Sequence, residues 1–377
     1  MAGHRDRTRT PSESRPGPPG FFAATLPGLG SLLRAEIADH PHLTADEEPG
    51  FDGRADIVSF RARRGARWEL SDLRLAEDVF TVVGDADGNA APRRVAAALL
   101  TQNGLERALS VWTRFVRHLS PAMTYRVITR VLDERRFKRT ELRRAVTETI
   151  AASRPRWRTE DPSGLEIWVL EHRKSQFVAG LRLSDQRMRQ HGEGRAAERH
   201  GALRPVVAAA MVRLAGQMPG RLLDPCCGSG AIVREALDSD WDARGSDIDA
   251  EAVEVASANL PAARVEQADA LKLPHADATF DAVVTNLPFG NQFKIDGDPK
   301  AWLIGALREF ARVTRPGGRV VVLQPPPTPK NPPGLTLLGS HPLRLLGTST
   351  RIWVYDRSDS PVGSGRDDVD PLVSVAR

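Results

Sequence analysis

Residues 224–230 read Asp224-Pro225-Cys226-Cys227-Gly228-Ser229-Gly230, and they decide how the second half of the chain folds. The segment lies between a short apolar stretch, Arg221–Asp224, and a helical pattern, Ala231–Leu237. Glycines at such a junction permit a sharp turn and a close approach of the backbone to a ligand, and the start of the helix supplies free N–H groups. Loops that bind dinucleotides carry a third glycine or an alanine where this chain has Val233, so the pattern argues against a dinucleotide.

The loop belongs to a repeated order of strand, loop and helix, which follows a helix opened by Pro205 and covering Val206–Gly216. The expected strands are short and apolar: Arg221–Asp224, Ala243–Asp247, Ala263–Gln267, Ala282–Thr285 and Arg319–Leu323. This order is typical of the α/β class, with a doubly wound, Rossmann-like parallel sheet. We expect an antiparallel hairpin at its end, in which Gly347-Thr348-Ser349 joins Leu343–Leu346 to Ile352–Tyr355.

Acidic residues, Asp224, Asp247 and Asp269, mark the ends of the first three strands. The two coplanar oxygens of Asp247 can accept both hydroxyls of a ribose, and Asp269 can accept from an exocyclic adenine amine. Each acid alone also suits a loop or a helix cap, but the three together indicate a nucleoside site at the carboxyl edge of the sheet. The predicted lining of this site is Asp224, Cys226, Gly228, Ser229, Gly230, Asp247, Ile248, Asp269, Ala270 and Asn286.

The fourth strand ends in a motif with possible catalytic residues, Asn286-Leu287-Pro288-Phe289 followed by Gly290. The side-chain oxygen of Asn286 can accept from an amino group, and Pro288 holds Leu287 extended so that its carbonyl also faces the site. Phe289 offers a face on which a flat base can stack. The motif suits methylation of an exocyclic amine, because transfer from a sulfonium is an in-line displacement that needs positioning more than a strong base. A tight turn with Phe289 in the core is the alternative.

The first half of the chain has a different pattern. Strand-like and helical stretches alternate irregularly, at Phe21–Thr25, Leu29–Ile37, Met123–Val131 and Lys138–Ala151. Ile167–Leu170 and Phe177–Leu183 are expected to pair as a hairpin through the polar turn at His172–Ser175. This mixture favours an α+β region. Residues 1–20 and 361–377 contain few apolar residues and are expected to form loose tails, and residues 191–204 a linker.

The two halves of the chain differ in net charge, although the formal net charge of the whole chain is only +5. Between Glu106 and His200 there are 21 lysines and arginines against 12 acids, a net charge of +9, whereas Gly201–Ser360 has a net charge of −1. A basic region beside a nearly neutral one is typical of a protein that holds a polyanion in one part and acts with the other. A solvated basic surface is the alternative.

Composition excludes several classes of protein. No run of about 18 apolar residues occurs, and the amino terminus lacks the apolar stretch of a signal peptide, so we expect a cytoplasmic protein without membrane contact. The two cysteines, Cys226 and Cys227, are adjacent, which disfavours a disulfide between them and gives no metal-ligand spacing. We therefore expect no metal site and a reducing compartment.

Together the motifs resemble class I S-adenosylmethionine-dependent methyltransferases that methylate amino groups. Within that class the chain is similar to the THUMP-domain methyltransferases that make N2-methylguanosine in tRNA. The resemblance covers about residues 21–357. It is carried by four segments: Phe21–Leu29, Gly201–Ala208, Asp224–Gly230 and Asn286–Gly290. Many relatives have two prolines after the asparagine, whereas this chain has Leu287 before Pro288.

The resemblance implies a role for each matching residue. Asp224, Gly228 and Gly230 would line the methionine end of S-adenosylmethionine. Asp247 would bind its ribose and Asp269 its adenine. Asn286 and Phe289 would hold the guanine.

It also implies a division of the chain into a ferredoxin-like domain at 21–100, an RNA-binding THUMP domain at 101–190 and a class I methyltransferase domain at 205–360. The basic residues expected to grip RNA are Arg135, Arg136, Lys138, Arg139, Arg143 and Arg144.

The expected activity is therefore methylation of a guanosine N2 amine in the acceptor-stem region of tRNA, with S-adenosylhomocysteine as the second product. We expect tRNA as the partner, no obligatory protein partner and a monomer. Enzymes that methylate guanine in rRNA, or adenine or cytosine in DNA, use the same motif, so these substrates remain alternatives. A catalytically silent RNA-binding protein is the alternative from another class. The methylated nucleotide and the choice between mono- and dimethylation stay open.

Overall fold

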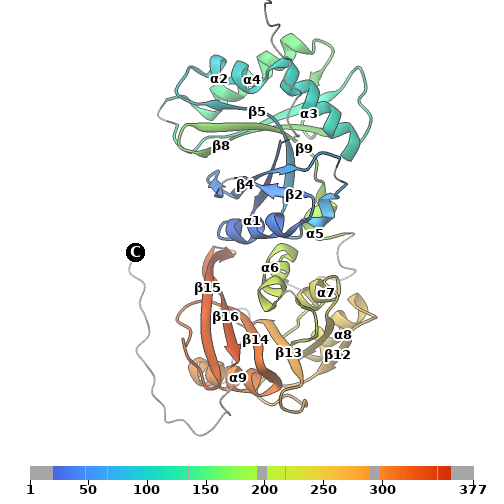
Figure 1. Ribbon diagram of the computed structural model, residues 1–377, viewed down its shortest axis with the longest axis vertical. Helices are drawn as coiled ribbons and strands as arrows, with labels where there is room; N and C mark the ends of the chain where they lie inside the picture. The colour runs from blue at the N-terminus through green and yellow to red at the C-terminus, as the bar shows by residue number, and fades with distance from the viewer. Residues whose placement is uncertain are drawn as a thin grey trace, which may run out of the picture.

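The computed structural model describes residues 20–46, 48–65, 67–134, 136–192, 202–216, 218–288, 298–345 and 347–357. The tails expected at 1–20 and 361–377, apart from Gly20, lie outside the described residues, as does most of the expected linker. Two sheets, each with its own helices, are arranged one above the other in Figure 1. The amino-terminal sheet carries the first half of the chain and the carboxy-terminal sheet the second.

The amino-terminal sheet contains nine strands among the described residues, in the order β2-β4-β1-β5-β9-β8-β6-β7, with β3 beside β4. Most neighbours are antiparallel, but β6 runs parallel to both β7 and β8. The strands are β1 (Gly20–Thr25), β2 (Leu43–Ala45), β3 (Gly50–Phe51), β4 (Asp56–Ala62), β5 (Asp78–Asp87), β6 (Thr124–Arg130), β7 (Arg158–Thr159), β8 (Leu165–Arg173) and β9 (Gln176–Arg182). This mixed sheet confirms the α+β region and the hairpin predicted at β8 and β9.

Helices lie on this sheet in two groups. In Figure 1, α2, α3 and α4 lie above the sheet, and α1 lies on the side facing the second half of the chain. Their bounds are α1 (Gly30–Asp39), α2 (Pro92–Leu99), α3 (Gln102–Phe115), α4 (Arg139–Ser153) and α5 (Gln186–Gln190), with a 3-10 turn, η1, at Leu70–Asp72.

The sheet is continuous across position 100, where a domain boundary was predicted. Strand β5 precedes that position and β9 follows it, yet they pair from Phe80 and Arg182 to Asp87 and Gln176. The division into a ferredoxin-like domain at 21–100 and a THUMP domain at 101–190 therefore stays a prediction, with strands from both ranges in one sheet.

Strand β1 is apolar on both faces because both faces are covered. Phe21 packs in the main core, with its ring centroid 5.4 Å from that of Phe60. Its neighbour Phe22 points to the opposite face and stacks on Phe80 at 4.6 Å. Successive side chains of a strand point to opposite faces, so a continuous apolar run is expected where both are buried.

The carboxy-terminal sheet has the order β12-β11-β10-β13-β14-β16-β15. Neighbours from β12 to β14 are parallel, whereas β16 runs antiparallel to both of its neighbours, β14 and β15. The strands are β10 (Arg221–Asp224), β11 (Asp242–Asp247), β12 (Arg264–Gln267), β13 (Phe280–Asn286), β14 (Thr314–Gln324), β15 (Leu335–Leu345) and β16 (Thr348–Arg357). The Rossmann-like sheet with an antiparallel end hairpin is confirmed, although β15 begins eight residues before the predicted Leu343.

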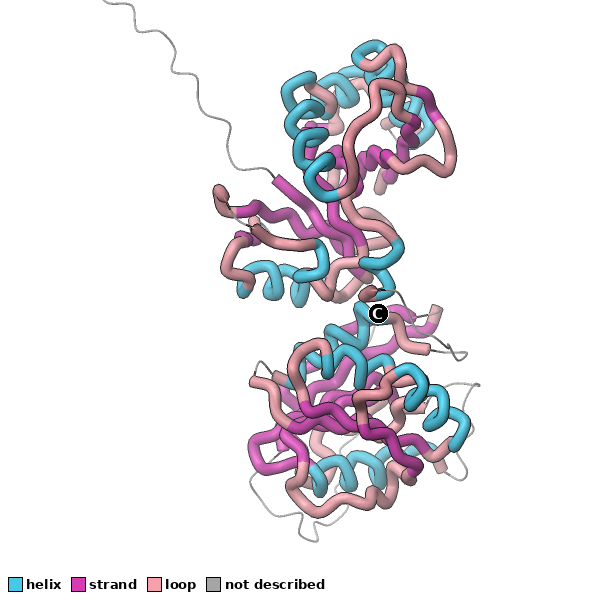
Figure 2. Tube along the Cα trace, turned by 90° about the vertical axis from the view of Figure 1, so that its right-hand side faces the viewer, coloured by secondary structure: helices cyan, strands magenta, loops and turns pink. Residues whose placement is uncertain are grey.

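Helices cover both faces of this second sheet (Figure 2). Leu222 of β10 packs in the core that contains α6 and α7, whereas its neighbour Leu223 packs in the core that contains α9. The helices are α6 (Pro205–Ala215), α7 (Ala231–Leu237), α8 (Ala250–Asn259) and α9 (Pro299–Val313). None of the helices in the described part of the chain combines the length and apolar composition needed to cross a bilayer.

Candidate active site

Strand order brings the predicted site residues to one edge of the second sheet. β10 lies between β11 and β13 and runs parallel to both, so the carboxyl ends of the three strands meet. Asp224 ends β10, Asp247 ends β11 and Asn286 ends β13. In open α/β sheets this edge, where the strand order reverses, is the usual place for a ligand.

The loop after β10 is held by backbone hydrogen bonds. The N–H of Cys227 donates to the carbonyl of Ser246 on β11 over 2.9 Å, and the N–H of Gly230 donates to the carbonyl of Cys227 over 2.8 Å. Gly228 donates to Oδ2 of Asp247 over 2.9 Å. The loop is therefore fixed to β11 before any ligand binds.

Gly228 and Gly230 both have positive φ, +53° and +86°, but they are required for different reasons. A Cβ added to Gly230 would lie 2.5 Å from Cδ1 of Leu260, so this position must be glycine for packing as well as for conformation. A Cβ added to Gly228 would meet no atom of the described residues within 4 Å. The backbone at Gly228 therefore faces open space at the edge of the sheet.

Asp224 is a buried carboxyl with 1% of its surface exposed. Burial raises the pKa of Asp224 to about 7, and the backbone N–H of Cys226, 3.2 Å from Oδ1, opposes this only in part. The charge of Asp247 raises it further. Asp224 is thus poised between its neutral and ionised forms near neutral pH.

Asp247 uses both oxygens to hold the backbone around it. Oδ2 accepts from Gly228, and Oδ1 accepts from the N–H of Asp249 over 3.1 Å. Each carboxylate oxygen has a second lone pair, so two acceptor positions remain for a ligand. The next residue, Ile248, is apolar yet 66% exposed, which places a hydrophobic side chain beside this carboxylate at the surface.

Asp269 lies beyond the third strand instead of ending it, because β12 stops at Gln267. The N–H of Ala268 donates to the carbonyl of Asp247 over 3.0 Å, which keeps this turn beside the end of β11. Oδ1 of Asp269 accepts from the N–H of Leu271 over 2.9 Å. The side chain is exposed at the edge of the sheet, whereas Ala270 is buried.

Asn286 carries a buried acceptor that has no hydrogen-bond partner in the described part of the chain. Its Oδ1 is shielded from solvent and has no hydrogen-bond partner among the described residues. An unpaired buried acceptor costs roughly 1–3 kcal/mol, a cost that a ligand N–H would remove. Leu287 is buried and donates its N–H to the carbonyl of Leu323 over 3.2 Å, which fixes the backbone after Asn286. Phe289 and Gly290 lie outside the described residues.

Cys227 and Ser229 of the loop are buried and Cys226 is partly buried, and the cofactor contacts expected of Cys226 and Ser229 stay predictions. Burial, followed by the charge of Asp224, raises the pKa of both the Cys226 and Cys227 thiols above the usual range, so neither is a thiolate at neutral pH. Ser229 is buried, and its carbonyl accepts from Nδ2 of Asn259 over 3.0 Å. The sequence reasoning missed Asn259, since a single asparagine at the end of a helix gives no signal of this contact.

Much of the predicted basic surface is exposed on and before α4. Arg136, Lys138, Arg139, Arg143 and Arg144 are all exposed, and Arg135 lies outside the described residues. A shallow cavity of about 470 Å³ is lined by Thr140, Arg143, Arg144, Thr147 and Glu148. Arg143 and Arg144 have no ion-pair partner among the residues that the structure describes. No group of three metal-binding side chains occurs in that part of the chain either.

Comparison with known proteins shows that the second half is similar to methyltransferases. Residues 193–328 match the family model described as RMKL-like, methyltransferase domain. The chain is 35% identical over 131 residues to the U6 snRNA (guanine-N(2))-methyltransferase THUMPD2 of Bos taurus, covering 32% of this chain and 25% of that protein. It is 31% identical over 173 residues to the tRNA (guanine(6)-N2)-methyltransferase of Thermus thermophilus, covering 42% of this chain and 50% of that protein.

A solved structure resembles almost the whole chain. The crystal structure of TrmN from Thermus thermophilus superimposes with a TM-score of 0.68 at 25% sequence identity, covering 90% of this chain and 99% of that one. The sequence matches span half or less of the two curated relatives, whereas the structural match extends through both halves. The resemblance drawn from the motifs is thereby confirmed.

Proposed function

We propose that the protein, whose residues 193–328 match the RMKL-like methyltransferase domain, methylates the exocyclic N2 amine of a guanosine in tRNA. S-Adenosylmethionine is the methyl donor and S-adenosylhomocysteine the second product. The buried Oδ1 of Asn286 at the end of β13 carries the proposal, because it is an acceptor to which none of the described residues donates a hydrogen bond.

The residues at the sheet edge fit the cofactor. The open space at Gly228 leaves room for a ligand against the loop backbone. Asp247 keeps two free acceptor positions for ribose hydroxyls, and exposed Ile248 offers an apolar surface for a flat ring. Asp224 would face the methionine end, where an ionised carboxylate would stabilise the positive charge of the ligand.

The chemistry requires positioning more than acid–base catalysis. The cofactor supplies an electrophilic methyl group on a sulfonium. Asn286 Oδ1 accepts from one amine N–H of the guanine, which holds the nitrogen in one orientation and favours the positive charge that develops on it. Once the new N–C bond has formed, the nitrogen loses its extra proton to solvent. The raised thiol pKa values of Cys226 and Cys227 exclude them as nucleophiles at neutral pH.

Two observations support RNA as the substrate. The region from Glu106 to His200 has a net charge of +9, and two of its exposed arginines, Arg143 and Arg144, line the cavity on α4. The two curated relatives are named as methyltransferases of guanine N2 in U6 snRNA and tRNA. We place the RNA grip in the THUMP range 101–190 and the target guanosine in the acceptor-stem region, in a monomeric cytoplasmic protein.

The test is transfer of tritium from labelled S-adenosylmethionine to bulk tRNA, rRNA and DNA. We expect label in tRNA. Asn286→Ala should lower the rate at least about 10²-fold, because it removes an oriented acceptor, while cofactor affinity changes by only a few-fold. Asn89→Ala, at an exposed position between β5 and α2 and outside the range assigned to RNA binding, is the matched control and should keep the wild-type rate.

The other outcomes of this assay distinguish among the alternative substrates and the alternative without activity. Label confined to rRNA or to DNA would replace tRNA with that substrate. Binding of tRNA with no label in any nucleic acid would identify a catalytically silent RNA-binding protein. Equal rates for Asn286→Ala and the wild type would contradict the proposed role of Asn286.

A further inference from the structure

Glu235 of α7 is a buried carboxylate that joins three distant segments. Its side chain is 3% exposed. Oε2 accepts from Nε and Nη2 of Arg74, at 3.1 and 2.7 Å. Oε1 lies 2.7 Å from Nδ1 of His191, whose side chain is 4% exposed. Arg74 belongs to the amino-terminal half, between η1 and β5, and also contacts Asp238 at 2.8 Å.

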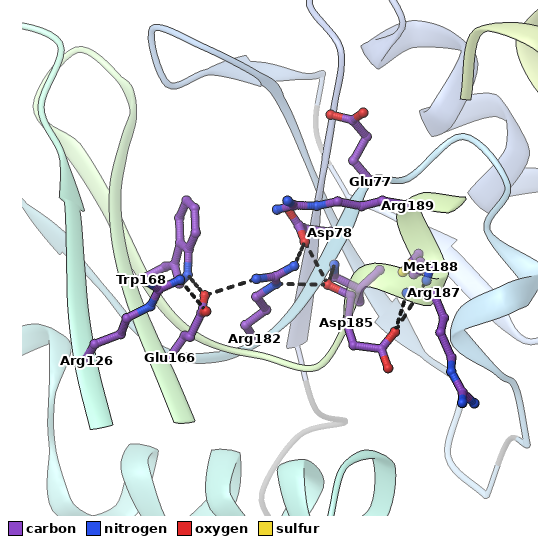
Figure 3. A network of polar contacts seen from close by, with 12 residues as sticks. Glu77, Asp78, Arg126, Glu166, Trp168, Arg182, Asp185, Arg187, Met188 and Arg189 are labelled. Carbon is purple, nitrogen blue, oxygen red and sulfur yellow. Dashed lines mark hydrogen bonds and ion pairs between the residues drawn. The ribbon is translucent and has the colours of Figure 1, made fainter. Parts of the chain in front are cut away.

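His191 is itself anchored to the amino-terminal sheet. It follows α5, which the polar network of Figure 3 attaches to β5. Arg189 of α5 forms an ion pair with Asp78 of β5. Arg182 of β9 contacts the same carboxylate at 2.8 Å and Glu166 of β8 at 3.2 Å. His191 thus approaches Glu235 from a segment anchored to the amino-terminal sheet, and Arg74 is held by its N–H, which donates to Glu36 of α1 over 3.1 Å.

On the other side, α7 is part of the candidate active site. The helix begins directly after Gly230, so Glu235 lies in the second turn beyond the loop. Its neighbour Arg234 donates to the carbonyl of Asn259 over 2.7 Å, and Asn259 donates to the carbonyl of Ser229. The helix and the loop are therefore joined to each other and move together relative to the amino-terminal half.

Buried ion pairs are poor stabilisers, because desolvation of the charges offsets most of their attraction, but they demand one geometry. An apolar contact between α7 and the amino-terminal half would allow sliding, whereas the two oxygens of Glu235 have separate partners. Further contacts restrain the same interface. Arg213 of α6 pairs with Asp39 of α1, Arg204 pairs with Glu77, and a Cβ at Gly28 would overlap the carbonyl of Pro342 on β15.

We propose that Arg74, His191 and Glu235 are positioning residues that fix the orientation of the RNA-binding half relative to the methyl-transfer site and thereby select the methylated nucleotide. The inference rests on the proposed function, because it needs an RNA held by one half and modified by the other. It assigns Arg74 and His191 a role in specificity although neither belongs to the candidate site.

The first experiment measures the orientation of the two halves and does not depend on methyltransferase activity. Small-angle X-ray scattering compares the wild type with Arg74→Ala and with the isosteric Glu235→Gln, each in the full chain. We expect a larger radius of gyration for both variants. Arg319→Ala, which removes a half-exposed ion pair to Asp356 within the second sheet, is the control and should match the wild type. Scattering profiles of both variants identical to that of the wild type would overturn the proposal.

The second experiment maps the methylated nucleotide. For Arg74→Ala and Glu235→Gln we expect kcat/KM for tRNA to fall by about 10²-fold, since a displacement of about 1 Å has that cost, and label to appear at a neighbouring nucleotide. The affinity for S-adenosylmethionine should stay within about twofold, whereas general damage to α7 would lower it. Arg74→Lys, which keeps the charge, should recover part of the lost rate.

An unchanged nucleotide with unchanged kcat/KM in both variants would refute the role in specificity. The wild-type reaction separates this result from failure of the proposed function. If the wild type labels no RNA, the proposed function is wrong, and the scattering data still decide whether the cluster holds the two halves together.

Discussion

Gly228 donates its backbone N–H to Oδ2 of Asp247 over 2.9 Å, and this bond ties the loop after β10 to the end of β11. The loop and the carboxylate expected to bind ribose therefore hold each other in place. A site with such preformed contacts loses little conformational entropy when a ligand binds. The residues around this bond give the most direct tests of the site.

Gly228→Ala should mainly weaken cofactor binding, whereas Gly230→Ala should mainly lower the stability of the fold. An alanine at 228 costs about 1–2 kcal/mol from positive φ, and its methyl group projects into the space assigned to the cofactor. An alanine at 230 has the same conformational cost and also overlaps Leu260. Calorimetry should show the larger loss of cofactor affinity for Gly228→Ala, and thermal unfolding the larger loss of Tm for Gly230→Ala. The reverse order would place the ligand elsewhere.

The affinity for S-adenosylmethionine should rise about tenfold between pH 6 and pH 8. Asp224, with a pKa of about 7 in the free protein, is mostly neutral at pH 6 and ionised at pH 8, and a cationic ligand favours the ionised form. Binding at pH 7 should then release protons, which calorimetry detects in buffers of different ionisation enthalpy. Asp224→Asn, which cannot ionise, should bind with little dependence on pH. Wild-type affinity that is constant over this range would contradict the assignment.

Asp224 also affects folding in the absence of ligand. Its pKa is raised in the folded state above the ordinary value of 3.8, so the folded protein binds more protons than the unfolded chain between about pH 4 and pH 7. The free energy of unfolding should therefore fall as the pH rises through this window. In urea titrations at pH 5 and pH 8, the free energy of unfolding of the wild type should fall more with rising pH than that of Asp224→Asn. Equal decreases in the two proteins would contradict a raised pKa of Asp224 in the folded state.

The sequence predicted correctly those strands and helices in which apolar residues recur at a regular spacing. Strand β10 and helix α7 have the bounds expected, Arg221–Asp224 and Ala231–Leu237, because a buried apolar strand and a glycine turn leave little freedom. The start of β15 was missed because Gly339, Ser340 and Pro342 interrupt its apolar run. That strand lies at the edge of the sheet, where proline is tolerated, and pairing with β16 defines it.

The site was predictable where it follows strand ends and unpredictable where it depends on distant contacts. Asp224, Asp247 and Asn286 converge because parallel strands end at one edge. By contrast, Arg74 and Glu235 are 161 residues apart, and a glutamate on a short helix has the sequence pattern of a surface residue. Only the packing of the two halves shows that it is buried.

Cys226 and Cys227 should resist alkylation by iodoacetamide at pH 8 in the folded protein. Burial raises the pKa of both thiols, so the reactive thiolate is scarce and poorly accessible. Mass spectrometry should find both cysteines unmodified in buffer and both modified in urea. Rapid modification of either cysteine in buffer would show that the loop opens.

Replacing Arg143 and Arg144 together by alanine should weaken tRNA binding and its dependence on salt. For each phosphate that the protein no longer neutralises, the slope of log affinity against log salt becomes shallower by about 0.7–0.9. We expect a reduction of about 1.5 for the double variant, measured by filter binding between about 50 and 200 mM salt. Arg308→Ala, an exposed arginine on α9, is the control with an unchanged slope. If the affinity of the wild type for tRNA did not depend on salt, the basic half would be ruled out as the RNA-binding region.

The continuous amino-terminal sheet determines where the chain tolerates cleavage. A cut at residue 100 would separate β5 from β9 and leave the backbone groups of β5, from Phe80 to Asp87, without partners along that edge. Such an edge recruits strands from other molecules and promotes aggregation. A cut between 192 and 202 leaves both sheets whole. For the exchange of modules between proteins, we therefore expect a junction between 192 and 202 to be tolerated better than one at residue 100.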